Sequence, residues 1–144
     1  MLTAGEIADA PVFADDLTVN GGVLVQSTGG SVTLQAGDDV DVQAGATVTA
    51  AGAATLTAGF GDLDGGGAVT QSGTVNAGGA VGLSSGGDLA VGAISAPGQA
   101  VTLTADSDAD GAGAITDANG VLTNVTATSL VAAAATGIDL DTDV

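Results

Sequence analysis

Apolar and polar residues alternate with a period of two in several short segments of the chain. These segments are Val32-Thr33-Leu34, Val40-Asp41-Val42, Leu89-Ala90-Val91, Val101-Thr102-Leu103 and Ile138-Asp139-Leu140. Such alternation, in segments rich in β-branched residues, is typical of strands with one buried side. Gly and Asp follow every seven or eight residues, which is too often for a helix of useful length. The run Ala132 to Ala135 favours a helix, but its flanks indicate another strand and turn. The pattern predicts an all-β protein.

The strand segments recur along the chain. Similar copies begin at Ser31, Ala53, Ala80 and Ala100, and a weaker fifth begins at Ala127. The copies therefore follow one another at intervals of roughly 20–27 residues, which is a repeat with insertions. Residues 62–70 also resemble residues 108–116 at a shift of 108 − 62 = 46, which suggests units of two coils. Within one coil, the apolar positions 32, 40, 48 and 56 are each eight residues apart. Three strand-and-turn units of this length make a coil of about 22 residues.

This period predicts a three-sided parallel β-helix, or β-solenoid, in which successive coils stack about 4.8 Å apart. We expect about six coils of roughly 20–27 residues and a rod about 30 Å long. Residues 1–16 are expected to form an N-terminal cap or linker, and residues 17–144 the solenoid. The expected inward residues are Val32, Leu34, Leu56, Leu83, Val101 and Leu103, and the expected outward residues are Thr33, Asp41, Thr49, Thr57, Thr102 and Thr104. The rival fold is a sandwich with hairpins at Asn20-Gly21 and Asn119-Gly120, but a sandwich does not explain a fixed period.

The composition restricts the function more than the fold. The chain has no Lys, Arg or His and 17 acidic residues, so its net charge is −17. Nucleic acids and anionic membranes are excluded as partners because both are bound through basic residues. General acid–base and nucleophilic catalysis depend mainly on His, Cys, Lys, Tyr and Arg, all of which are absent, so we expect no enzyme. With 45% hydrophobic residues the chain is expected to fold despite its charge.

The chain resembles the β-strand repeat regions of large bacterial exoproteins of the filamentous haemagglutinin type. The resemblance lies in residues 30–40, in Val101-Thr102-Leu103-Thr104-Ala105-Asp106 with residues 111–115, and in residues 136–144, and it extends from about Leu17 onward. It implies a right-handed parallel β-helix that is secreted or on the bacterial cell surface and serves in adhesion or aggregation. The family's secretion domain has no counterpart before Leu17, so we expect an internal fragment of a longer protein.

One acidic segment has the spacing of a calcium loop. Asp106-Ser107-Asp108-Ala109-Asp110-Gly111 matches D-x-D-x-D-G, and Asp117 occupies the twelfth position. Alternate carboxylates in a tight loop can converge on a hard cation, so the candidate calcium ligands are Asp106, Asp108, Asp110 and Asp117. The alternative is a solvated acidic turn, because the twelfth residue is not Glu and both flanks are predicted strands.

Three other features have a possible function and a structural alternative. Asp38, Asp39 and Asp41 form a second acidic cluster, but neighbouring strand residues point to opposite sides and cannot all bind one ion. The outward Thr residues suggest an ice-binding array, although Thr is also a common exposed strand residue. Asn124-Val125-Thr126 is a glycosylation sequon, which matters only after export through a eukaryotic pathway.

Together these observations predict a non-enzymatic structural segment of an extracellular bacterial adhesin or matrix fibre, with calcium as a candidate stabilising ion. Its expected partners are further copies, associating end to end, and a host or neighbouring cell surface. The alternatives are a stand-alone self-assembling fibre subunit and a calcium- or ice-binding solenoid domain.

Overall fold

The computed structural model describes residues 1–4, 15–61 and 66–144. The regular elements of this part of the chain are all β-strands, and every pairing between them is parallel. Within the same residues, no helix has the length and apolar character needed to cross a membrane. The all-β prediction is confirmed, and the hairpins of the rival sandwich are not formed at Asn20-Gly21 or Asn119-Gly120.

The strands stack into three faces, because each coil turns at three corners, from face A to B, from B to C and from C to the next face A. Face A consists of β1 (Leu2–Thr3), β4 (Val32–Gln35), β7 (Ala54–Thr57), β9 (Val81–Ser84), residues 101–104 of β10 (Leu89–Thr104) and residues 130–133 of β12 (Val125–Ala133). Face B consists of β2 (Leu17–Val19), β5 (Val40–Val42), residues 69–71 of β8 (Val69–Ala77), residues 89–91 of β10, β11 (Ala114–Asp117) and β13 (Gly137–Ile138). Face C consists of β3 (Leu24–Ser27), β6 (Thr47–Ala50), residues 74–77 of β8, residues 94–96 of β10, residues 125–127 of β12 and β14 (Thr142–Asp143).

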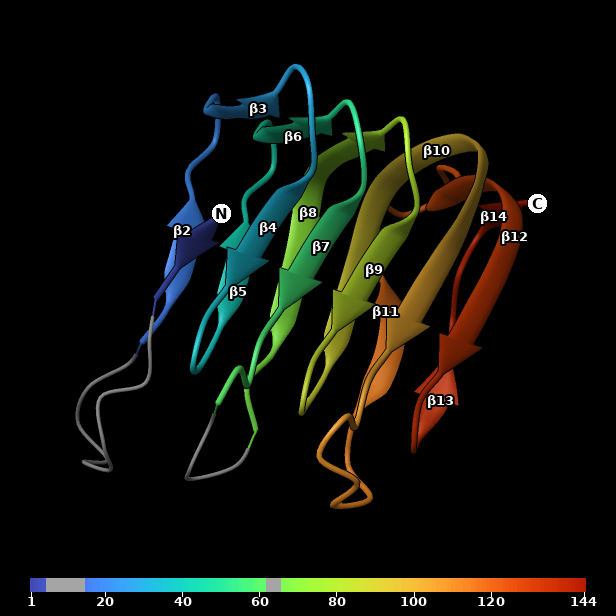
Figure 1. The fold of residues 1–144 in the computed structure, drawn as a ribbon. Helices are drawn as coiled ribbons and strands as arrows, with labels where there is room; N and C mark the ends of the chain where they lie inside the picture. Colours follow the sequence, from blue (N-terminus) through green and yellow to red (C-terminus); the bar gives the residue numbers. More distant parts are fainter. Residues whose placement is uncertain (5–14, 62–65) are drawn as a thin grey trace.

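The described strands form a right-handed parallel β-helix of six coils, as predicted. Figure 1 shows β4, β7 and β9 descending in front while β5 and β8 ascend behind, with face C closing the coil at the top. The eight-residue period corresponds to the three faces, since Val32 lies on face A, Val40 on face B and Val48 on face C. Val69 and Ile115, which belong to the two similar segments, occupy the same row of face B, because each pairs with Leu89.

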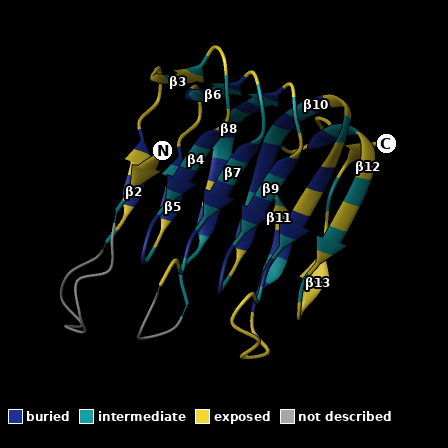
Figure 2. Cartoon of the chain, viewed as in Figure 1, coloured by how far each residue is buried: buried dark blue, intermediate teal, exposed yellow. Residues whose placement is uncertain are grey.

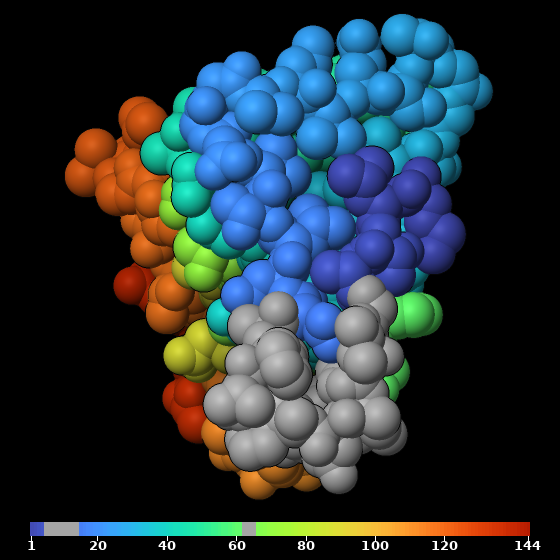
Figure 3. All heavy atoms as spheres, turned by 90° about the vertical axis from the view of Figure 1, so that its left-hand side faces the viewer, coloured from blue at the N-terminus to red at the C-terminus, as the bar shows by residue number. Residues whose placement is uncertain are grey.

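The interior is a stack of aliphatic side chains. Leu34, Leu56, Leu83 and Leu103 pair in succession across face A, and none is more than 1% exposed. The predicted leucine ladder is therefore confirmed. Figure 2 shows buried residues along the middle strands and more exposed ones at the two ends, and Figure 3 shows the outer surface of the N-terminal end. The predicted outward residues alternate with these buried positions and are half-buried or exposed.

The last copy differs from its prediction. Ala100 pairs with Ser129 and Val101 with Leu130, so the fifth copy begins at Ser129 and not at its predicted start, Ala127. The pairing shifts register at Pro97-Gly98-Gln99, on the corner between faces C and A, where Ala96 still pairs with Ala127. The predicted strand at Ile138-Asp139-Leu140 is also shorter, because β13 ends at Ile138.

Most of the predicted N-terminal cap, residues 5–14, lies outside the described residues. At its start, Leu2 pairs with Leu34 and Thr3 with Gln35, which extends face A by one strand.

The inner row of face B contains two polar residues, Gln71 and Asp117, which pair with Val91 from opposite sides. Gln71 is fully buried, and its amide accepts a hydrogen bond from Gly92 N at 2.9 Å and donates one to Gly73 O at 2.6 Å. An added Cβ at Gly92 would lie 2.5 Å from the carbonyl oxygen of Gln71, so this corner leaves no room for a side chain. Gln71 thus satisfies backbone groups that the tight turn between faces B and C leaves unpaired.

We expect Leu103→Ala to lower the free energy of unfolding by about 2–5 kcal/mol, because it leaves a cavity in the middle of the leucine ladder. Thr102→Ala, on the outer side of the same strand, should change it by less than about 0.5 kcal/mol. Urea denaturation followed by circular dichroism measures both. Leu103→Asp should prevent folding, since the chain has no basic side chain to pair with a buried carboxylate. Equal effects of the two alanine variants would contradict the inward placement of Leu103.

Candidate functional site

The acidic residues concentrate at one edge of the solenoid. We call the segments that join a strand of face A to the next strand of face B the A–B corner; these segments lie at the bottom of Figure 1. The described acidic residues of this corner are Asp15, Asp16, Asp38, Asp39, Asp88, Asp106, Asp108 and Asp110. Stacking the coils therefore brings carboxylates from different parts of the chain to one edge.

Some of these carboxylates connect one coil to the next. Asp39 N donates to Asp16 Oδ1 at 3.2 Å, and Ala68 N donates to Asp39 Oδ1 at 2.8 Å. Ala114 N likewise donates to Asp88 Oδ1 at 2.9 Å. Each donor and acceptor directly precedes the first inward residue of a face B strand. We call Asp16, Asp39 and Asp88 the pre-strand aspartates.

The pre-strand aspartates were not recognised from the sequence, where Asp39 appeared only as part of the cluster with Asp38 and Asp41. The available signal is that each directly precedes an apolar strand residue, Leu17, Val40 or Leu89. The three members of that cluster have different partners, but the reason is not the predicted alternation along a strand, because Asp38 and Asp39 lie in the corner before β5 and only Asp41 lies on the strand. Asp38 accepts a hydrogen bond from Asp15 N at 2.8 Å, Asp39 bonds to the next coil, and Asp41 lies on the outer row of face B.

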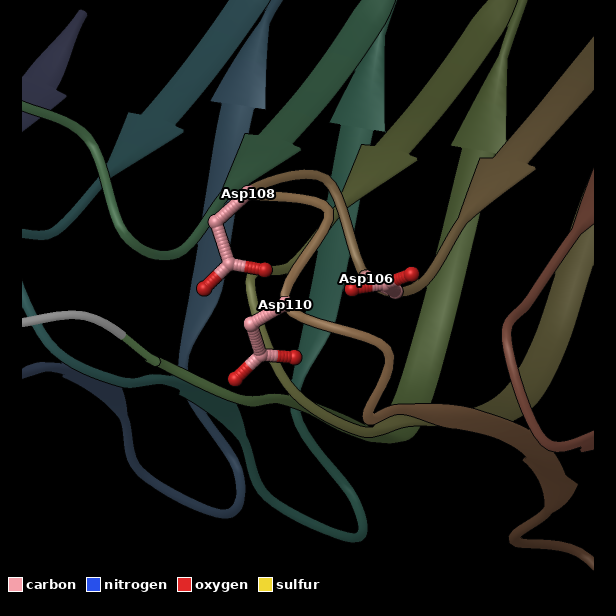
Figure 4. Close-up of side chains that lie close together, drawn as sticks. All are labelled: Asp106, Asp108 and Asp110. Carbon is pink, nitrogen blue, oxygen red and sulfur yellow. The ribbon is translucent and has the colours of Figure 1, made fainter.

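The candidate calcium loop forms the longest described A–B corner, between β10 and β11. Asp106, Asp108 and Asp110 each offer a carboxylate oxygen within 4.8 Å of the others, and Figure 4 shows Asp108 beside Asp110 with Asp106 farther along the loop. Oxygens bound to one calcium ion at about 2.4 Å can be this far apart. Asp106 Oδ1 and Asp110 Oδ1 already accept hydrogen bonds from Gly111 N at 3.0 Å and Ala112 N at 2.7 Å. The loop contains positive φ angles at Asp106, Ala109 and Gly111, which form its sharp turn.

Asp117 does not join this group. It lies at the end of β11, and its Oδ1 accepts hydrogen bonds from Asn119 N at 2.7 Å, Gly120 N at 3.1 Å and Asn124 Nδ2 at 2.9 Å. The Asn124 amide, followed by the Asn119 backbone N–H, holds the pKa of Asp117 below its usual value. The structure thus brings together three of the four predicted calcium ligands and gives the fourth a structural partner. A calcium ion takes six to eight oxygen ligands. An ion bound by these three carboxylates would therefore also need backbone carbonyls and water as ligands.

The sequon asparagine is buried. Asn124 has no exposed surface, and its Nδ2, the atom that would carry a glycan, donates to Val91 O at 2.6 Å as well as to Asp117. Its Oδ1 accepts a hydrogen bond from Asp141 N at 2.8 Å. The folded chain therefore has no room for a glycan at this position, and the sequon is a structural asparagine. It closes the base of the insertion at residues 118–124, whose orange atoms project at the left of Figure 3.

Comparison of the chain with protein-family models, with curated proteins and with solved structures finds no significant match to any of them.

The pre-strand role of Asp39 is tested by comparing Asp39→Ala with Asp39→Asn. Both variants remove one negative charge, but the Asn side chain retains an oxygen that accepts a hydrogen bond from Ala68 N. We expect Asp39→Ala to be less stable than Asp39→Asn by about 0.5 kcal/mol, the low end for a hydrogen bond, because this one is exposed. Urea denaturation measures the difference. The same pair of substitutions at Asp41 is the control and should show none.

The contribution of Asp117 to the free energy of unfolding should depend on pH. Its pKa is lower in the folded chain than its ordinary value of 3.8, so the ionised form favours folding. The advantage of the wild type over Asp117→Asn is then fully present above that value, and it is lost as the pH falls through the lower pKa of the folded state. Thermal melts of both proteins from pH 6 to about pH 2 measure it. An advantage that stays constant over the whole range would contradict the lowered pKa.

Salt should stabilise the solenoid, because folding brings acidic residues together without a basic side chain to balance them. We expect the melting temperature to rise with sodium chloride, and to rise further with calcium chloride at matched ionic strength if the loop at Asp106 binds the ion. Asp108→Asn should abolish the extra rise, whereas Asp41→Asn, with the same change in charge, should retain it. Equal rises with the two salts would identify the loop as an ordinary acidic turn.

Proposed function

We propose that the chain is a non-enzymatic segment of a rigid β-helical shaft in a secreted or surface-exposed bacterial adhesin or matrix fibre. The observation that carries this proposal is that each face continues in parallel pairing through all six described coils. Each coil contacts its neighbours alone, so such a structure can be lengthened without a new fold. A shaft uses this property to hold an adhesive part at a distance from the cell.

The chemistry of the side chains agrees with a structural role. The sequence contains no His, Cys, Lys, Tyr or Arg. Its buried polar residues Gln71, Ser85 and Asn124 are hydrogen-bonded to backbone groups of the corners. The acidic edge favours cations and repels anionic polymers, which suits a rod surrounded by salt.

The last coil provides the surface through which the shaft would continue. β13 pairs with β11 and β14 with β12, and neither has a partner on its other side within the described residues. Ile138 follows Ile115 on the inner row of face B, yet Ile138 is 51% exposed and Ile115 is fully buried. A further coil placed on this edge would bury Ile138 and pair the free backbone groups. We propose that this coil comes from the continuing shaft or from a second copy of the chain.

Light scattering and negative-stain microscopy over a salt series test the proposal. We expect particles one solenoid wide that lengthen as salt screens the repulsion between copies that each carry a charge of −17. Ile138→Asp should prevent the lengthening. The control is Val121→Asp, which adds the same charge at a side chain that is 96% exposed in the lateral insertion, and it should leave the lengthening unchanged.

Two outcomes would contradict or change the proposed function. A strictly monomeric particle at high salt and high protein concentration would show that the edge does not accept another coil, and would overturn it. Filaments of indefinite length from the purified chain would favour the self-assembling fibre subunit over the shaft segment.

A further inference from the structure

The outer side of face A carries a two-dimensional array of short polar side chains. One row contains Thr33, Thr55, Gly82 and Thr102, and the next contains Gln35, Thr57, Ser84 and Thr104. We call these eight positions the hydroxyl array, since six of them are Thr or Ser. Both rows stay in register across four successive coils, and their side chains are half-buried or exposed.

The hydroxyl array lies away from the charged edge. The sequence has no acidic residue in 18–37, 42–61, 65–87 or 89–105, and these ranges include all four of its strands and the turns that lead into them from face C. The described carboxylates of these coils instead gather at the A–B corner and, with Asp41, on face B. A molecule that approaches face A directly therefore meets uncharged hydroxyl, amide and methyl groups.

The spacing of the array is regular because the backbone determines it. Neighbouring strands are about 4.8 Å apart, and alternate residues along a strand are about 6.7 Å apart. Beneath the array, Leu34, Leu56, Leu83 and Leu103 are packed in an interior that keeps the face rigid. These two backbone repeats are close to the spacings at which oxygen atoms recur on the prism surface of hexagonal ice, so the hydroxyls and methyls that they carry can order water in an ice-like layer. We propose that the hydroxyl array binds ice.

A second copy of the chain is the other candidate occupant of face A, and the area argues against it. The five four-residue strands of face A and the two-residue β1 cover about 350 Å². Two such faces in contact would bury about 700 Å², less than the roughly 1,000 Å² expected of a specific interface. Ice adds no charge repulsion to a chain that carries −17, whereas a second copy does.

The test is inhibition of ice recrystallisation by the purified chain, with folding of each variant checked by its melting curve. We expect the wild type to slow the growth of ice crystals and Thr55→Lys to lose this effect. Thr49→Lys is the matched control, because it adds the same charge to the outer row of face C, between Gln26 and Asn76. It should retain the activity.

Gly82→Thr provides a gain of function that does not depend on a disruptive substitution. A Cβ at Gly82 meets no atom within 4 Å, and a threonine at this position would complete the row between Thr55 and Thr102. We expect this variant to inhibit recrystallisation at a lower concentration than the wild type.

The ice proposal is overturned if the wild type has no effect, or if Thr49→Lys loses as much activity as Thr55→Lys. Light scattering on the same samples distinguishes the other occupant, because a dimer that Thr55→Lys dissociates would assign face A to a second copy. The shaft proposal does not depend on this result, since its test concerns the edge at Ile138 and not the outer side of face A.

Discussion

Parallel register between successive coils is the constraint on which the rest of the structure depends. Each strand hydrogen-bonds to the equivalent strand of the coils before and after it, so an inward residue always lies on an inward residue. A slip by one residue would turn Leu56 outward and Thr55 inward, which would bury hydroxyl groups without partners. The register therefore also produces the regular outer rows, because the same backbone positions both sides of each strand.

The corners absorb the differences in coil length. On face A, the chain takes a shorter path from Leu83 to its partner Leu103 than from Leu103 to its partner Ala132. The extra residues leave the solenoid between strands, as the loop at Asp106 does at the A–B corner and residues 118–124 do between faces B and C. Backbone groups that lose their ladder partners there are satisfied by a few polar side chains, above all Gln71 and Asn124.

The difference in hydrogen bonding between the stacked strands and the corners explains where the acidic residues lie. The A–B corner offers backbone N–H groups that donate to carboxylate partners, and it is exposed enough for the remaining charge to be hydrated. Faces A and C have no comparable need, since their N–H groups are already paired between coils. The result is a rod with one acidic edge and with face A free of acidic residues. Ice binding on face A uses the surface that this separation leaves uncharged, whereas extension at the last coil depends on salt to screen the charge of −17 that each copy carries.

The sequence by itself determined the elements of this solenoid, because its strongest signals are local and repeated. Alternation in Val32-Thr33-Leu34 shows which side of a strand is buried, and the eight-residue period gives three faces and the stacking of Leu34 on Leu56. The partners of the corner residues were decided by the tertiary structure. Asp117 looked like the twelfth ligand of a calcium loop, yet it bonds to Asn124, and Asn124 looked like an acceptor for a glycan although it is fully buried.

The register of the last copy was likewise decided by tertiary structure, where the shift at Pro97-Gly98-Gln99 pairs Val101 with Leu130. The hydrogen bonds of Asp39 to Asp16 and to Ala68, which lie in the neighbouring coils, were also decided by the tertiary structure. A repeat in the sequence indicates which positions are equivalent. Hydrogen bonds between coils also depend on how many residues each corner contains outside the stacked strands, and only the stacked coils define that number.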